Sequence, residues 1–104
     1  MRTYLLPKEG QFYKANLHCH TVLSDGKKTP EQVKELYKSL GYSIVAFTDH
    51  DIFIPHPELN DDTFLALHGF EAEINENKPL DWREVKCCHI CFIALDPTTV
   101  NQPC

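Results

Sequence analysis

The sequence predicts an α/β fold in which a strand, a loop, a helix and a strand form a βαβ-like unit that is followed by a β-hairpin. Three observations carry this prediction. A capped amphipathic helix lies between two apolar segments, each apolar segment borders a run of polar residues, and the two later apolar segments are joined by a short connection. With 104 residues, the chain is expected to form a single domain over residues 1–104.

The helix has clear start and stop signals. Thr29 is a good N-cap, Pro30 suits the first helical position and Gln32 completes a capping box. Gly41 stands where a C-terminal glycine belongs. One apolar face follows from the helical spacing of Val33, Leu36, Tyr37 and Leu40.

Two strands flank this helix. Residues 12–17 predict a short strand that runs directly into His18-Cys19-His20, and residues 21–28 predict a polar loop. The nearly continuous apolar run at 42–48 predicts a buried strand ending at Thr48-Asp49-His50-Asp51. Because sites in α/β proteins gather beyond the C-terminal ends of parallel strands, we expect the polar residues at these two ends to lie together.

The second half of the chain predicts a hairpin. Residues 64–74 and 85–95 predict strands, and roughly ten residues join them, whereas a parallel pair needs a dozen or more. We therefore expect antiparallel pairing. A turn centred near Leu80 would place Glu71 opposite His89.

Histidine and carboxylate residues gather at these strand ends. His18 and His20 are two apart, and side chains i and i+2 of a strand lie on the same face, so both imidazoles can reach one metal ion. The loop, the second strand end and the hairpin add further donors. Mixed imidazole and carboxylate ligation suits zinc, iron or manganese better than calcium or magnesium. The candidate metal ligands are His18, His20, Asp25, His50, Glu71 and His89.

Other polar residues near these candidates have alternative interpretations. Glu73 shares the strand face of Glu71, and the two could exchange roles. Asp49 could orient an imidazole as a hydrogen-bond acceptor, or be a solvated loop residue. We interpret His56 and His68 as structural or exposed rather than as ligands.

The cysteines could form a rival site, because Cys88-His89-Ile90-Cys91 is formally a C-x-x-C motif. In a strand, however, positions i and i+3 point to opposite faces, so this pair cannot chelate one ion without a turn. We expect these cysteines to act as small buried hydrophobic residues. Cys19 is expected to face away from the two histidines beside it.

Composition excludes several functional classes. The net charge is −5 and no Lys/Arg cluster is present, which argues against nucleic-acid binding through a basic patch. Neither a signal peptide nor a membrane-spanning apolar run is evident, and five cysteines form no disulfide framework. A cytoplasmic location without membrane association is therefore expected.

Four segments resemble the PHP (polymerase and histidinol phosphatase) superfamily. Asn16 to Thr21, together with Ser24-Asp25-Gly26, resembles its first motif, and Phe47-Thr48-Asp49-His50-Asp51 resembles its second. Gly69-Phe70-Glu71 looks like the segment that carries a bridging glutamate, and Cys88-His89-Ile90 like the segment with the next ligand histidine. The resemblance covers about residues 12–95 and implies the N-terminal part of a distorted (β/α) barrel of PHP type.

The resemblance also implies a multinuclear metal site that hydrolyses phosphate esters. Carried over residue by residue, the implied ligands are His18 and His20 for one ion, Glu71 as a bridge to a second ion that His89 also binds, and Asp25 with His50 for a third.

We expect hydrolysis of a small phosphorylated substrate by metal-bound hydroxide, because no side chain is an obvious nucleophile. Members of the superfamily are longer and carry further ligands beyond this point, so we expect this chain to be a truncated part of such a domain. The alternative is a non-catalytic, incomplete metal-binding fragment that self-associates through exposed sheet edges, and a homo-oligomer could share ligands between chains.

Overall fold

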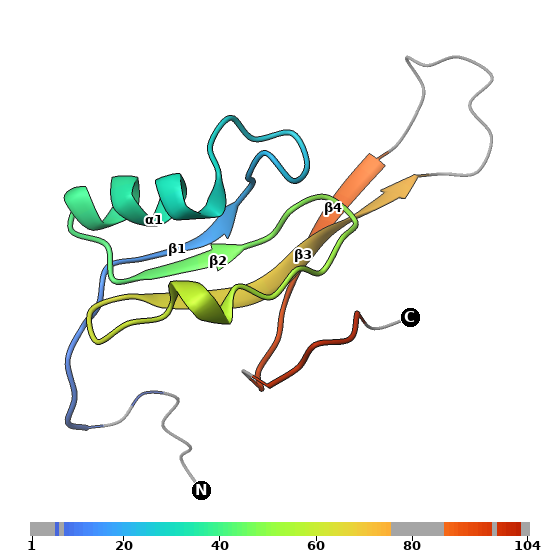
Figure 1. The fold of residues 1–104 in the computed structure, drawn as a ribbon. Coiled ribbons are helices and arrows are strands. Elements are labelled where there is room, and N and C mark those ends of the chain that lie inside the picture. Colours follow the sequence, from blue (N-terminus) through green and yellow to red (C-terminus); the bar gives the residue numbers. More distant parts are fainter. Residues whose placement is uncertain (1–5, 7, 76–86, 97, 103–104) are drawn as a thin grey trace, which may run out of the picture.

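The computed structural model describes residues 6, 8–75, 87–96 and 98–102. These residues form a mixed α/β structure with one curled four-stranded sheet, one α-helix and one short 3-10 helix (Figure 1). The elements in chain order are β1 (Ala15–Cys19), α1 (Pro30–Ser39), β2 (Ile44–Phe47), η1 (Pro57–Leu59), β3 (Leu65–Asn75) and β4 (Cys87–Ile93).

The strands lie in the order β1-β2-β3-β4. β1, β2 and β3 are mutually parallel, and β4 pairs antiparallel with β3. The predicted α/β class, the βαβ unit and the antiparallel hairpin are therefore confirmed. The predicted turn near Leu80 lies in the segment 76–86, outside the described residues.

The first strand differs from its predicted range. β1 begins at Ala15 rather than at residue 12, because pairing with β2 starts at the Ala15–Ile44 pair. Phe12 is 99% exposed, so the apolar character of this segment does not reflect burial. The register shifts between Asn16 and Cys19, and β1 extends through His18 instead of ending before it.

The helix begins as predicted. The side chain of Thr29 accepts a hydrogen bond from the Gln32 backbone N–H at 3.3 Å, and the Gln32 side chain accepts one from the Thr29 backbone N–H at 3.0 Å. Gly41 follows the C-cap with φ +82°, the left-handed conformation that glycine adopts without strain. Leu36 and Leu40 are 41% and 55% exposed, so the buried stripe of α1 is narrower than its spacing predicts.

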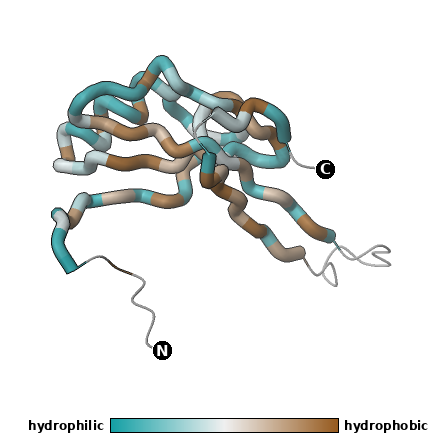
Figure 2. Tube along the Cα trace, turned by 90° about the horizontal axis from the view of Figure 1, so that it is seen from below, coloured by the Kyte–Doolittle hydropathy of each residue, from teal (hydrophilic) through white to brown (hydrophobic). Residues whose placement is uncertain are grey.

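One hydrophobic core joins α1 and η1 to the sheet. α1 and η1 pack against the face of the sheet that carries Val45 and Phe47, and Figure 2 shows hydrophobic residues concentrated along the strands. The buried core residues are Val33, Val45, Phe47, Leu59, Phe64 and Ala66, with Cys19 and Tyr37 packed against them.

No helix among the described residues is long and apolar enough to cross a membrane.

The hairpin register differs by two residues from the predicted one. Glu71 pairs with Cys91, and Glu73 pairs with His89. Phe70 lies opposite Phe92 with the two rings stacked at 5.1 Å, a cross-strand aromatic pair that favours this register. The prediction of a direct Glu71–His89 pair was wrong because it used connection length alone. Since a shift of two keeps side chains on the same face, both residues still lie on one side of the sheet.

Candidate metal centre

Glu71 is the centre of the cluster of histidines and acids. The Glu71 backbone forms hydrogen bonds to the two residues that flank His50. Its N–H donates to the Asp49 carbonyl at 3.1 Å, and its carbonyl accepts from the Asp51 N–H at 2.8 Å. Only 4% of the residue is exposed. A carboxylate buried in this way needs partners that compensate its charge.

Four imidazoles surround this buried carboxylate, and they come from three neighbouring parts of the sheet. β1 and its end supply two, the segment after β2 supplies one and β4 supplies one. The contacts are His18 Nε2 at 3.7 Å and His89 Nδ1 at 3.1 Å from Oε1, and His20 Nε2 at 2.8 Å and His50 Nδ1 at 3.3 Å from Oε2.

The two histidines of β1 reach the carboxylate by different routes. His18 lies in the irregular part of β1, and its Nδ1 is 2.8 Å from the hydroxyl of buried Thr48. If Nδ1–H donates to Thr48, the Nε2 lone pair faces Glu71 and can bind a metal ion. His20 follows the end of β1, and its ring lies edge-on to the His18 ring at 4.8 Å.

Asp25 lies on the other side of His20 and His50. Its Oδ1 is 2.6 Å from His20 Nδ1, and its Oδ2 is 3.2 Å from His50 Nε2. The hydrogen bond from His20 holds the pKa of the Asp25 carboxyl below its usual value. Each of these two imidazoles therefore has one nitrogen toward Glu71 and the other toward Asp25.

Asp49 links the two sequence motifs through hydrogen bonds. It is 2% exposed, and its carboxylate accepts hydrogen bonds from Thr21 N–H at 2.7 Å, the Thr21 hydroxyl at 3.0 Å and the Ser24 hydroxyl at 2.6 Å. Asp49 thus connects the segment after β2 to the loop that carries Asp25. Neither interpretation made from the sequence was correct, because this carboxylate is buried and holds a loop rather than an imidazole.

Gly26 completes this loop by a close backbone approach. A Cβ atom at this position would lie 2.5 Å from the carbonyl oxygen of His20. Its N–H donates to the Thr21 carbonyl at 2.8 Å. Glycine at position 26 therefore permits the tight loop that brings the Asp25 carboxylate to His20 Nδ1.

The hairpin contributes His89 and distinguishes the two glutamates. His89 contacts Glu71 through Nδ1, and its Nε2 is 3.6 Å from Glu73 Oε2. The Glu73 side chain is 40% exposed, whereas that of Glu71 is 6% exposed. Glu71 is thus the central carboxylate, and Glu73 lies at the margin.

One close contact shows that this cluster suits a cation. His20 Nε2 and Glu71 Oε2 lie 2.8 Å apart, yet both are buried and neither has a hydrogen-bond partner of acceptable geometry among the described residues. Buried polar groups without a hydrogen bond cost about 1–3 kcal/mol each. A divalent ion bound by both atoms would remove this cost, so the residues present fit a metal.

The sequence reasoning did not include the cysteines among the candidate donor residues. Cys87, Cys88 and Cys91 are exposed, which contradicts the expectation of buried hydrophobic residues. Cys87 and Cys91 share the strand face of His89, whereas Cys88 lies on the opposite face, as strand geometry requires. Counting by twos from His89 would have identified both. Cys19 packs against the core, away from the histidines beside it, as predicted.

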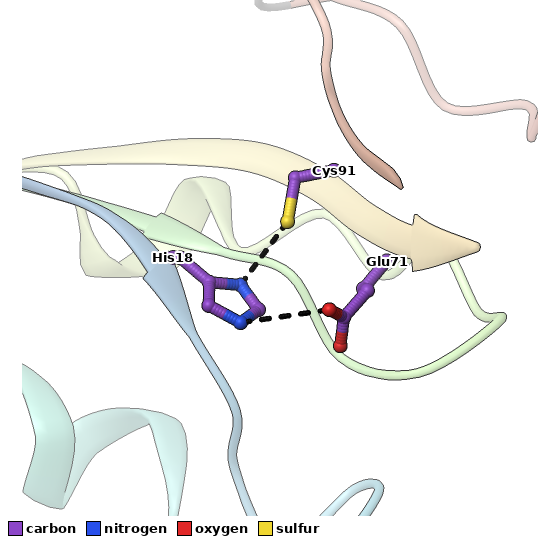
Figure 3. A group of neighbouring side chains, drawn as sticks. All are labelled: His18, Glu71 and Cys91. Carbon is purple, nitrogen blue, oxygen red and sulfur yellow. Dashed lines mark hydrogen bonds and ion pairs between the residues drawn. The ribbon is translucent and has the colours of Figure 1, made fainter. Parts of the chain in front are cut away.

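Cys91 lies within this cluster (Figure 3). Its sulfur is 3.2 Å from His18 Nδ1, and desolvation, followed by the charge of Glu71, raises the pKa of its thiol.

His56 and His68 are buried elsewhere and belong to none of the donor groups. Three groups of donor atoms within 4.8 Å of one another occur among the described residues: His18–Glu71–Cys91, His20–His50–Glu71 and Glu73–Cys87–His89.

A comparison with protein-family models finds no match to this chain, and a comparison with curated proteins finds none either.

Proposed function

We propose that this chain is the N-terminal part of a PHP-type metal-dependent phosphoesterase domain, and that its cluster binds zinc, iron or manganese. The observation that carries the proposal is the convergence of four imidazoles on the buried Glu71 carboxylate. The motif order along the chain adds support, because the segments that resemble PHP motifs supply the residues that meet at this carboxylate.

The chain's own residues would bind and position the ions. The resemblance assigns His18, His20 and Glu71 to one ion and His50 with Asp25 to another. Among the described residues, however, the donor atoms of His18 and His20 belong to different groups, one with Cys91 and one with His50, and both groups share Glu71. When bound, divalent ions would lower the pKa of a water molecule and neutralise phosphoryl oxygens. Thr48 and Asp49 act indirectly, since Thr48 orients His18 and Asp49 holds the loop of Asp25.

The direct test is metal content. We expect purified protein to retain zinc, iron or manganese, and the double substitution His18→Ala with His20→Ala to remove most of it. His68→Gln is the matched control, because His68 belongs to none of the donor groups and should leave metal content unchanged. Elemental analysis that finds equal metal in the double variant and in the wild type would refute the ligand assignment.

The second candidate function is metal binding without turnover by an incomplete chain that self-associates. Exposed apolar side chains favour it, because Leu17 and Leu65 are 55% and 41% exposed on strands of the open sheet. β1 and β4 are edge strands within the described sheet, and open edges favour self-association.

Turnover distinguishes the two candidates. A catalytic metal commonly has three protein ligands and an open position, and misplacement of about 1 Å can cost on the order of a hundredfold in rate. Asp25 and His50 alone would hold their ion loosely, so we expect little hydrolysis of an aryl phosphate by this chain with excess manganese or zinc. Rapid turnover that His50→Ala abolishes would show instead that the chain is a competent enzyme.

A further inference from the structure

Cys91 presents a sulfur atom at the cluster of histidines and acids around Glu71, and neither the motifs nor the proposed ligand set includes it. β4 pairs Cys91 directly with Glu71, so the two side chains leave the sheet on the same face. The sulfur lies 3.2 Å from His18 Nδ1, and His18 Nε2 lies 3.7 Å from Glu71 Oε1 (Figure 3). One donor atom from each of these three residues lies within 4.8 Å of the other two.

The two nearest separations, 3.2 Å and 3.7 Å, are close to those of ligands around one ion, although they involve different ring nitrogens of His18. With metal–sulfur bonds of about 2.3 Å and metal–nitrogen bonds of about 2.0 Å, tetrahedral donors stand roughly 3.3–3.6 Å apart. The sulfur is nearest to Nδ1 of His18, whereas the carboxylate is nearest to Nε2. Cys91 is exposed, so rotation about its Cα–Cβ bond can move the sulfur toward Nε2 without moving the strand.

A second observation at the same carboxylate points to a cation. The Glu71 side chain is 6% exposed, and its Oε2, which faces His20 and His50 rather than His18, has no hydrogen-bond partner among the described residues. A buried carboxylate oxygen without a hydrogen bond is costly in the metal-free protein. It therefore marks this face of the sheet as a place where a positive charge would be stabilised.

We infer that Cys91 is a sulfur ligand of the ion bound by His18 and Glu71. The position then takes a thiophilic divalent cation, zinc before manganese or magnesium, because thiolate ligands select softer metals. The inference rests on the proposed metal-binding function, and it adds a ligand and a metal preference to it. Cys88 cannot take this role, because it lies on the opposite face of β4.

Cobalt(II) provides a direct probe, since a thiolate ligand gives a sulfur-to-cobalt charge-transfer absorption in the near ultraviolet. The 104-residue chain is reduced, freed of metal and titrated with Co(II) without oxygen. Absorption and bound cobalt are followed in the wild type, Cys91→Ser, Cys88→Ser and Cys87→Ser. Cys88→Ser is the matched control from the same strand, and Cys87→Ser tests the separate group with Glu73 and His89.

The charge-transfer absorption should appear in the wild type, persist in Cys88→Ser and Cys87→Ser, and disappear in Cys91→Ser. Cobalt affinity in Cys91→Ser should fall by about tenfold or more, because even hydrogen-bond partners of metal ligands change affinity by roughly 10- to 100-fold. Cobalt that binds to the wild type without this absorption would overturn the inference and leave the proposed metal centre standing. No cobalt binding at all would overturn both, and absorption that depends on Cys87 would assign the sulfur ligand to the other group.

A second measurement needs no variant and therefore does not depend on the folding of one. Alkylation of the wild-type chain, with each cysteine followed by peptide mass mapping, should be slowed at Cys91 by zinc and unchanged at Cys88. Equal alkylation rates at Cys91 with and without bound zinc would refute sulfur ligation.

Discussion

Glu71→Gln tests the cluster most sharply, because Glu71 belongs to two of the three donor groups. The substitution keeps the size of the side chain and removes its charge. The four imidazoles at 2.8–3.7 Å then face an amide, which binds metal ions poorly. We therefore expect both groups to lose affinity together, whereas a substitution at His18 or His50 would affect one.

The expected loss of zinc-induced stabilisation in Glu71→Gln follows from the linkage between metal binding and folding. Taking the loss at each position as about 100-fold, the upper end of the range for hydrogen-bond partners of metal ligands, the binding free energy falls by about 2.8 kcal/mol. At a free zinc concentration of about 100 times the wild-type Kd, one ion stabilises the wild type by about 2.7 kcal/mol. The same zinc is then at about the Kd of the variant and stabilises it by only about 0.4 kcal/mol. The difference, about 2.3 kcal/mol, corresponds to a zinc-induced rise in Tm that is smaller by roughly 10 °C.

The assay is thermal unfolding with and without zinc, together with metal analysis after dialysis. Glu73→Gln is the control, because Glu73 lies on the same face of β3 but its side chain is 40% exposed at the margin of the cluster. It should keep most of the zinc-induced rise in Tm. If Glu71→Gln shows the same zinc-induced rise as the wild type, the central role of this carboxylate is refuted.

Two further substitutions test the loop and the helix. Gly26→Ala should lower both stability, by about 1–3 kcal/mol, and zinc affinity, because its Cβ would meet the His20 backbone at 2.5 Å. Gly41→Ala is the control for this substitution. It should lower the free energy of unfolding by about 1 kcal/mol, because Gly41 has a positive φ, and leave zinc affinity unchanged. Equal zinc affinities in the two variants would contradict the loop argument. For Asp61, the hydrogen bond from Lys34 holds the carboxyl pKa well below its usual value, so its stabilising contribution is complete above a pH of about 5 and is lost as the pH falls through the folded-state pKa. The stability difference between the wild type and Asp61→Asn, measured by urea unfolding, should therefore shrink between about pH 5 and pH 2, and a constant difference would argue against this ion pair.

Local interactions made α1 and the general order of strands predictable. Thr29, Pro30 and Gln32 form the cap within a few residues of one another, and Gly41 ends the helix through its own backbone conformation. Apolar periodicity identified four strands, although β1 begins later than predicted because its pairing with β2, rather than its own sequence, sets its start.

The composition of the candidate site was also visible in the sequence. Alternation along strands and the position of strand ends predicted that these six residues lie close together. In the structure, each of them contacts another residue of this set. That these residues bind metal remains a prediction, as does the PHP-type barrel to which the motifs point.

The tertiary structure decided the features that depend on pairing between distant segments. Stacking of Phe70 on Phe92 selects the register of β3 and β4, and this register places Cys91 rather than His89 directly opposite Glu71. Burial of Asp49 depends on the loop that closes over it. Period-two patterns determine which face a side chain occupies, but a shift of two residues leaves every face unchanged. The sequence by itself therefore determined that the six predicted residues share one site and that Cys91 shares the strand face of His89. Only the packed sheet decided which of these residues touch and that the sulfur of Cys91 lies beside His18.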